Sequence, residues 1–208
     1  MVWVVKDRTI NGSETGSSFK QALFFMELGF ALYDTMIYLK PSPSVPTESR
    51  YYDVFEYMFV FCKGQRPKTL NFLEDRMNKH PGRVAKYESN INHEGKAGRV
   101  VTTKKRLTKQ YGRRFNVWKY NPSRNTTRHT AVFPEDLAKD HIESWSNIGD
   151  TVLDPFMGSG TTGKMARFLN RSFIGIEIDS EYFQIAERQL EDSAPQFNSL
   201  DRMGSPNQ

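Results

Sequence analysis

Residues 151–177 contain the feature that most constrains the fold: two short apolar runs separated by a glycine-rich turn and a helix-competent segment. The first run ends in Asp154, and Gly158 and Gly160 follow, where glycine lets the backbone turn tightly against a ligand. The second run leads to Glu177, 19 residues after Gly158. In nucleotide-binding α/β folds an acid at a spacing of roughly 20 residues holds ribose hydroxyls. The pattern predicts a strand–turn–helix–strand unit for a ribose-bearing cofactor.

The same glycines match most of a phosphate-binding P-loop, because four residues separate Gly158 from Gly163 and Lys164 follows. A P-loop needs Ser or Thr at the next position to hold Mg²⁺, and Met165 offers only a thioether. The carboxylate of Asp154 would repel phosphate, whereas it suits an amino-bearing ligand. S-adenosyl-L-methionine is therefore favoured over a nucleoside triphosphate, and a P-loop nucleoside triphosphatase remains the third interpretation of the chain.

The run Asp154–Thr162 resembles the cofactor motif of the DNA amino-methyltransferases, and its flanks resemble the beta class of that family. The resemblance covers nearly all of residues 1–190 and implies an α/β fold: a Rossmann-like sheet of an S-adenosyl-L-methionine-dependent methyltransferase with an inserted basic target-recognition region. The further segments that carry the resemblance are 2–7, 17–19, 56–57, 60–64, 129–137 and 147–150.

The resemblance also implies roles for individual residues. Asp154 is expected near the ammonium group of the cofactor's methionine part, and Glu177 on the ribose hydroxyls, although an exposed charge at a strand end is the alternative for Glu177. Asp179 is expected either near the adenosine or as a solvated helix-start residue. The full set expected to bind cofactor is Phe133, Pro134, Asp154, Pro155, Phe156, Gly158, Ser159, Gly160, Thr161, Thr162 and Glu177. Thr161 and Thr162 are expected on the cofactor's carboxylate or as helix caps, near a helix end that favours anions.

The family's catalytic motif, an Asp, Asn or Ser followed by Pro-Pro and an aromatic residue, is not found in this sequence. Its polar groups accept the hydrogens of a poorly nucleophilic exocyclic amine while the ring stacks on a flipped base. We therefore assign no catalytic residue. A truncated sheet is one expectation, with a separate polypeptide supplying the motif; a naturally short variant and an inactive DNA-binding remnant are the alternatives.

Positive charge is concentrated in the middle of the chain. Residues 63–128 hold 18 basic and four acidic side chains, a net charge of +14, whereas residues 1–62 carry −2 and residues 129–208 carry −7. Such a segment can neutralise the phosphates of double-stranded DNA, although a solvated basic face is the alternative. The residues expected to bind DNA are Lys104, Lys105, Arg106, Arg113 and Arg114, with Tyr111, Phe115, Trp118 and Tyr120 interleaved to offer flat rings.

Four regions are expected: an N-terminal sheet part at 1–63, the basic insert at 64–128, a cofactor-binding part at 129–192 and a disordered tail at 193–208. Residue types and turn signals predict the secondary structure within them, including a proline-rich loop around Pro41, Pro43 and Pro46. The expected strands are Val2–Val5, Thr35–Leu39 and Phe55–Cys62. The expected helices are Ser18–Leu28, one after Pro134, Lys164–Leu169, and Glu181–Leu190 with Ser180 as its cap.

No run approaches the roughly 18 apolar residues of a membrane span, and no signal peptide is recognisable, so a cytoplasmic location is expected. The histidines lack Cys partners at metal-ligand spacing, and no metal site is predicted. Cys62 is expected to be a buried structural thiol. Lys6 and Asp7 end a strand on the expected ligand side, with an ordinary surface ion pair as the alternative.

Overall fold

A computed structural model describes residues 1–41, 49–91, 97–121 and 133–193, and the side chains of 85–106 lie outside that description. The chain divides into two compact units, one formed by residues 1–71 with 116–208 and the other by residues 72–115. The expected proline-rich loop lies mostly outside the described residues, and so does nearly all of the expected disordered tail. Among the described residues, no helix is long and apolar enough to cross a membrane.

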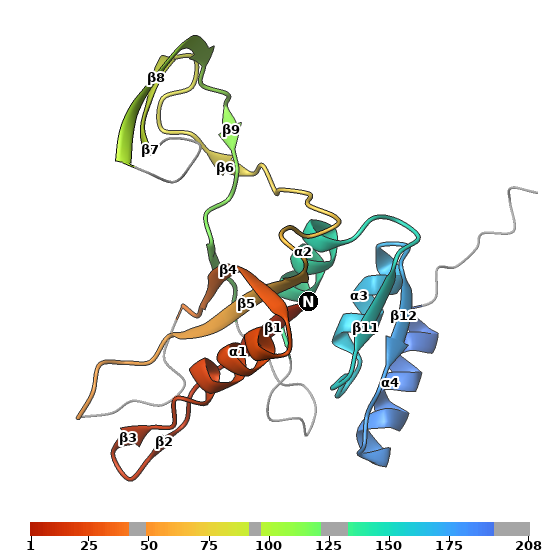
Figure 1. The fold of residues 1–208 in the computed structure, drawn as a ribbon. Coiled ribbons are helices and arrows are strands. Elements are labelled where there is room, and N and C mark those ends of the chain that lie inside the picture. The colour runs from red at the N-terminus through yellow and green to blue at the C-terminus, as the bar shows by residue number, and fades with distance from the viewer. Residues whose placement is uncertain (42–48, 92–96, 122–132, 194–208) are drawn as a thin grey trace, which may run out of the picture. The chain divides into compact units, whose positions relative to one another are not determined.

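The first unit contains a four-stranded sheet in the order β1-β5-β4-β10 (Figure 1). The strands are β1 (Val2–Val5), β4 (Phe30–Leu39), β5 (Phe55–Lys63) and β10 (Val117–Lys119). β5 runs antiparallel to both β1 and β4, and β10 runs parallel to β4. The run Met58–Cys62 of β5 is buried on both faces, as expected for a central strand.

The predicted strands Val2–Val5 and Phe55–Cys62 are confirmed, and the second is one residue longer in the structure. The third, predicted as Thr35–Leu39, begins five residues earlier at Phe30. Gly29, at a φ of 89°, ends the preceding helix and turns the chain directly into the strand. A bulge between Leu32 and Asp34 interrupts the alternation of side chains there, which is why the first half of the strand does not show a clear pattern.

Two helices cover opposite faces of this sheet. Helix α1 (Ser17–Glu27) packs over the face that carries Phe59 and Phe61. Helix α2 (Glu135–Trp145) packs over the face of Met58, whose sulfur lies 3.2 Å from His141 Nε2. Both predicted helices are confirmed, and each begins within one residue of its predicted start.

A second sheet in the same unit has two parallel strands, β11 (Thr151–Asp154) and β12 (Ser172–Gly175). Helix α3 (Thr161–Phe168) connects them, and α4 (Ser180–Asp192) follows β12 (Figure 1). Ala138 and Ile142 of α2 form a core cluster with Met165 and Ala166 of α3, against which Val152 and Phe173 of the strands pack. Gly163 permits this packing, because a Cβ there would lie 2.5 Å from the Phe173 ring.

A hairpin of β2 (Thr9–Ile10) and β3 (Ser13–Glu14) joins β1 to α1. Asn11 and Gly12 form its turn with φ of 50° and 76°, the left-handed values that a two-residue hairpin turn requires.

The second unit, residues 72–115, contains two antiparallel pairs. The short pair is β6 (Arg76–Met77) with β9 (Tyr111–Gly112), and the longer hairpin is β7 (Val84–Ile91) with β8 (Ala97–Leu107). This unit falls within the expected basic insert.

Candidate functional site

The glycine-rich turn lies at the carboxyl end of β11. Asp154 Oδ1 accepts a hydrogen bond from the backbone N–H of Phe156 at 3.0 Å, which fixes the first part of the turn. The Met157 N–H donates to the Ile176 carbonyl at 3.1 Å and thereby ties the turn to the chain after β12. Gly158 and Gly160 have φ of 53° and 90°, conformations that side chains rarely adopt. The predicted order of strand, turn and helix is confirmed, but α3 begins at Thr161, three residues before the predicted start at Lys164, because the turn ends at Gly160.

Glu177 follows β12 and faces the turn. Its Oε2 accepts the Gly158 N–H at 2.8 Å, while Oε1 accepts the N–H groups of Ile178 and Asp179 at 2.9 and 3.0 Å. The hydrogen bond from Asp179 N–H, together with those from Gly158 and Ile178, lowers the pKa of Glu177 against opposing desolvation and the nearby Asp179 charge. An ionised carboxylate oxygen accepts up to two hydrogen bonds, so Oε2 keeps one acceptor position for a hydroxyl.

The start of α2 is held beside α3. Pro134 is buried and Phe133 packs partly against the cluster that joins the two helices. Lys164 Nζ on α3 donates to Glu135 Oε1 at 2.6 Å. The lysine that suggested a P-loop therefore makes an ion pair with α2.

The structure contradicts the cap alternative for Thr161 and Thr162 and the predicted cap at Ser180. Gly160 is the N-cap of α3 and no side chain caps that helix, so neither Thr161 nor Thr162 does. Thr161 is instead buried and Thr162 half-buried within the first turn. Asp179, and not Ser180, caps α4: its Oδ1 accepts the N–H groups of Glu181 and Tyr182 at 2.8 and 3.2 Å. Asp179 has the extended backbone of a cap residue, whereas Ser180 already has helical geometry.

Asp7, which follows β1, accepts hydrogen bonds from residues at the start of α1. Its Oδ1 accepts from Thr15 Oγ1, Ser17 Oγ and the Ser18 N–H at 3.1, 3.0 and 3.1 Å, and its Oδ2 accepts from Ser18 Oγ. Burial tends to raise the pKa of Asp7, but these hydrogen bonds, led by those from Ser18, lower it to about 2. Asp7, two residues after β1, thus caps the start of α1 through the Ser18 N–H.

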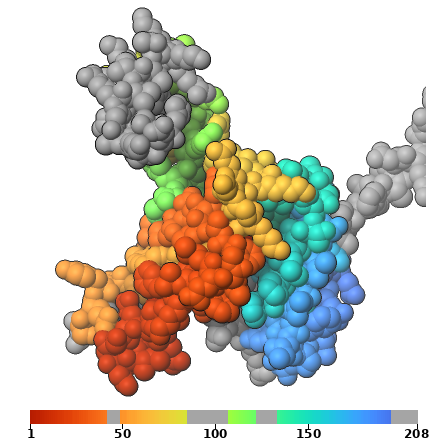
Figure 2. All heavy atoms as spheres, in the orientation of Figure 1, coloured from red at the N-terminus to blue at the C-terminus, as the bar shows by residue number. Residues whose placement is uncertain are grey.

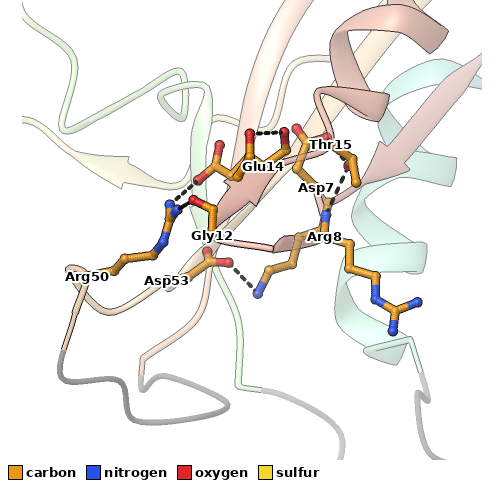
Figure 3. Close-up of polar contacts among 9 residues, drawn as sticks. Asp7, Arg8, Gly12, Glu14, Thr15, Arg50 and Asp53 are labelled. Atoms are coloured by element: carbon orange, nitrogen blue, oxygen red, sulfur yellow. Dashed lines mark hydrogen bonds and ion pairs between the residues drawn. The ribbon is translucent and has the colours of Figure 1, made fainter. Parts of the chain in front are cut away.

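Lys6 makes a surface ion pair, which was the alternative expected for Lys6 and Asp7, but its partner is Asp53 and not Asp7. Lys6 Nζ pairs with Asp53 Oδ2 at 2.7 Å, and Asp7 is occupied by hydroxyls. Figure 3 shows Asp53 near Arg50, whose guanidinium lies 3.8 Å from Glu14 Oε1 and also donates to the Gly12 carbonyl. These contacts tie the segment before β5 to the hairpin.

In the second unit two of the arginines predicted to bind DNA, Arg113 and Arg114, have local partners. Arg113 lies over the Phe72 ring at 3.8 Å from its centroid, a cation–π contact. Arg114 Nε donates to both carboxylate oxygens of Asp75 at 3.1 Å, and this hydrogen bond lowers the pKa of Asp75. Lys109 pairs with Glu74 at 2.9 Å. The strand β8 carries Lys104, Lys105 and Arg106, whose side chains lie outside the described set.

Trp118 was expected among the rings offered to bases, and the structure places it elsewhere. It lies in β10 of the four-stranded sheet with 5% of its surface exposed, and its ring packs against that of His141 in a tilted arrangement, with centroids 4.6 Å apart. The sequence did not predict this buried position, because Trp118 lies among basic residues and Val117–Lys119 is too short to show a strand pattern. His141 also accepts from Trp145 Nε1 at 3.3 Å, so this histidine belongs to the core.

Cys62 is buried and free, as predicted. Within the part of the chain that the structure describes, no group of three or more His, Cys, Asp or Glu residues is arranged to hold a metal ion. Arg124, Arg128 and His129 lie outside the described residues.

A family model described as DNA methylase, covering N6 and N4 enzymes, matches residues 1–188. The chain belongs to the N6/N4 DNA methylase family. The orphan methyltransferase M.BamHII of Bacillus amyloliquefaciens is 53% identical over 198 residues, which are 91% of this chain and 74% of that protein. M.HpaI of Haemophilus parainfluenzae, a type II methyltransferase, is 41% identical over 90 residues, 41% of this chain and 29% of M.HpaI.

Two solved structures share the fold of this chain. The M1.HpyAVI–SAM complex aligns with a TM-score of 0.55 and 27% identity over 91% of this chain and 74% of that one. The cytosine-N4-specific PvuII DNA methyltransferase aligns with a TM-score of 0.62 and 18% identity over 90% and 62%. The predicted α/β methyltransferase fold and the predicted family are therefore confirmed.

Proposed function

We propose that this DNA methylase chain binds S-adenosyl-L-methionine and DNA and takes part in methyl transfer to the exocyclic amine of adenine or cytosine. The observation that carries the proposal is the Glu177 carboxylate, which links the end of β12 to the glycine-rich turn through Gly158. In open α/β sheets, ligands bind at the carboxyl ends of the strands, where this pair lies.

The residues at this edge fit the cofactor. A Cβ at Gly158 would meet nothing within 4 Å, so the chain leaves open space beside the turn. Oε2 of Glu177 retains an acceptor position for a ribose hydroxyl, and the Asp154 carboxylate suits the ammonium group of the methionine part. Bound there, S-adenosyl-L-methionine supplies an electrophilic methyl group on a sulfonium. Phe133, Pro134, Pro155, Phe156, Ser159, Gly160, Thr161 and Thr162 complete the proposed binding set.

Calorimetric titration with S-adenosyl-L-methionine tests this site. Glu177→Ala should weaken binding by about 10- to 100-fold, because a hydroxyl loses a charged acceptor and the turn loses its anchor. Glu187→Ala, an exposed change on α4, is the matched control. Unchanged affinity in Glu177→Ala would contradict the assignment, and tighter binding of ATP with Mg²⁺ would favour the nucleoside triphosphatase alternative.

We further propose that the second unit contacts the phosphates of double-stranded DNA. The +14 charge of residues 63–128 supports this proposal, as do the three consecutive cations of β8. Arg113 and Arg114 belong to the proposed surface, although their local partners give them a second task in holding the unit together.

Fluorescence anisotropy with a DNA duplex at several salt concentrations tests the DNA surface. Replacing Lys104, Lys105 and Arg106 by Ala should lower affinity and reduce the slope of log K against log salt by up to about 3, roughly 0.9 per lost phosphate contact. Arg188→Ala on the exposed face of α4 should leave the slope unchanged. An equal slope in the triple variant would contradict the proposal.

Methyl transfer also needs groups that orient the amine, and residues 1–208 contain no Pro-Pro-aromatic run. We propose that a further polypeptide segment supplies them. Transfer of labelled methyl to duplex DNA should then be undetectable with the chain alone and appear when a polypeptide carrying that motif is added. Cofactor binding without transfer in either case would favour an inactive DNA-binding remnant.

A further inference from the structure

Two arginines of the second unit each lie over an aromatic ring. The guanidinium carbon of Arg76, in β6, lies 4.4 Å from the centroid of the Phe115 ring. That of Arg113 lies 3.8 Å from the centroid of the Phe72 ring. The two pairs are joined, because Arg76 Nε donates to the Arg113 carbonyl at 2.8 Å. In Figure 2 the yellow and green segments that contain these residues adjoin on the face shown. The four residues form one cluster, named here the arginine–phenylalanine cluster.

The backbone of β6 and β9 holds this cluster in place. Arg76 pairs with Gly112 in the antiparallel register. The Arg114 N–H donates to the Leu73 carbonyl at 2.9 Å and so continues the contact between the two chain segments. Gly112 leaves room for the guanidinium, since a Cβ there would lie 2.7 Å from Arg76 Nη2. A guanidinium that is already held by a ring and a backbone carbonyl loses little rotational freedom when it binds a ligand. The cluster is therefore preorganised.

The cations in the described part of this unit have two kinds of partner. Lys109 and Arg114 each pair with a carboxylate, at 2.9 and 3.1 Å. Among the described residues, neither Arg76 nor Arg113 makes an ion pair or donates a hydrogen bond from its Nη groups. An aromatic ring orients a guanidinium through its face and leaves the N–H groups at the edge of the plane available. These two arginines therefore present oriented donors that no described carboxylate neutralises.

The surface around these donors is apolar. Between 43% and 67% of the surface of each large apolar side chain on β6, on β9 and in the cluster is exposed: Phe72, Met77, Tyr111 and Phe115. A phosphate contact needs a cation and no apolar neighbour. Base edges in the major groove, in contrast, combine hydrogen-bond acceptors with the apolar methyl group of thymine. Fixed donors within an apolar surface therefore match base edges better than phosphates.

We propose that Arg76 and Arg113 determine sequence specificity by donating from their guanidinium groups to O6 and N7 of guanine bases in the DNA major groove. The inference rests on the proposed function, because it assigns base readout to a part of the unit proposed to contact DNA. Two donors in one plane match O6 and N7 of a guanine, and a lysine cannot offer that pair. Arg113 of the proposed DNA surface then contacts a base edge, while the cations of β8 contact phosphates.

Selection from a pool of duplexes with about ten randomised base pairs, using the full chain, tests the protein side of this contact. The wild type should enrich sites with guanine at one or two fixed positions. Arg76→Lys and Arg113→Lys keep the charge but lose the planar fork, so each should reduce the preference for one guanine by about 5- to 100-fold. Arg83→Lys is the matched control, at an exposed arginine of the same unit that lies over no described ring. It should enrich the wild-type site.

A modified base tests the DNA side of the contact. In 7-deazaguanine a C–H group replaces N7, which removes one acceptor from the base edge. Placed at the selected guanine, it should weaken wild-type binding by about fivefold or more and leave the affinity of the Lys variant that reads this position unchanged. Phe115→Leu removes the ring under Arg76 and should reduce the guanine preference, whereas Phe115→Tyr keeps the ring and should retain it.

The outcomes separate base readout from a purely structural cluster and from the proposed function. Lys variants with a lower melting temperature but the wild-type site would mean that the cluster only holds β6 to β9, and would overturn the proposal. Duplex binding by the wild type without any base preference would overturn it as well and leave the proposed phosphate contacts standing. A wild-type chain that binds no duplex would contradict the proposed DNA surface, and the base readout with it.

Discussion

Gly158 donates its backbone N–H to Glu177 Oε2 at 2.8 Å, which makes the conformation of the turn depend on the residue after β12. Because Gly158 has a φ of 53° and open space around its Cβ position, Gly158→Ala strains the backbone by about 1–2 kcal/mol without a steric clash. We expect a stable variant whose affinity for S-adenosyl-L-methionine falls by about tenfold or more. Calorimetric titration measures this loss, and an unchanged affinity would show that the turn does not contact the cofactor.

Gly160→Ala, unlike Gly158→Ala, is expected to reduce the stability of the fold through a steric clash. Its added Cβ would lie 3.0 Å from the Ala186 Cβ and 3.1 Å from the Ala186 Cα, at a φ of 90°. The close backbone of α4 cannot give way cheaply, so the free energy of unfolding should fall by about 2 kcal/mol or more. Thermal denaturation of both variants separates a lost binding site from a lost packing contact.

The lowered pKa of Asp7 predicts that the free energy of unfolding decreases at acid pH. Its pKa is lowered from 3.8 to about 2 in the fold, so the carboxylate stabilises the native state fully above pH 4 and loses this effect as pH falls toward 2. Because the group is partly exposed, we expect only about 1 kcal/mol. Urea denaturation of the wild type and Asp7→Asn should show this gap at pH 6 and a smaller one at pH 3. A gap that is constant with pH would contradict the role of the charge.

Substitution of Lys164 tests whether this lysine is structural or binds the ligand. Its ion pair with Glu135 at 2.6 Å is partly exposed on both sides, and such pairs contribute less than about 1 kcal/mol. Lys164→Met should therefore change the melting temperature by only a few degrees and leave the affinity for S-adenosyl-L-methionine within about threefold. A binding defect as large as that of Glu177→Ala would show that the lysine acts at the ligand.

Local signals predicted the elements that have strong local causes. The serines and the spaced apolar residues before Gly29 predicted α1, and the glycine-rich turn predicted the β11–α3–β12 unit. The signal for the β2–β3 hairpin, Asn11-Gly12, was present in the sequence and was missed. The pairing of β10 with β4 has no local signal, since it joins Val117 to Ile37 across 80 positions.

The site was predictable in its backbone and less so in its side-chain partners. Spacing alone brought Glu177 to the turn that contains Gly158. Asp7 caps α1 because the chain after β1 lies beside the start of a helix that begins ten residues later. No spacing rule describes this arrangement. Cap residues also depend on backbone angles, which is why the sequence predicted Ser180 as the cap of α4 and the structure has Asp179 there.

Asp75 restrains one of the arginines that we propose to contact DNA. Arg114 Nε donates to both of its carboxylate oxygens at 3.1 Å, which neutralises the cation and holds it in place. Asp75→Asn leaves an acceptor but removes the negative charge, so the affinity for a DNA duplex should rise about two- to tenfold. The slope of log K against log salt should steepen by up to about 0.9 if the freed cation reaches a phosphate. Glu187→Gln on α4 removes the same charge from the other unit and should change the affinity much less. Weaker DNA binding by Asp75→Asn would instead mean that Arg114 serves mainly to shape the second unit, and that other cations of residues 63–128 contact the phosphates.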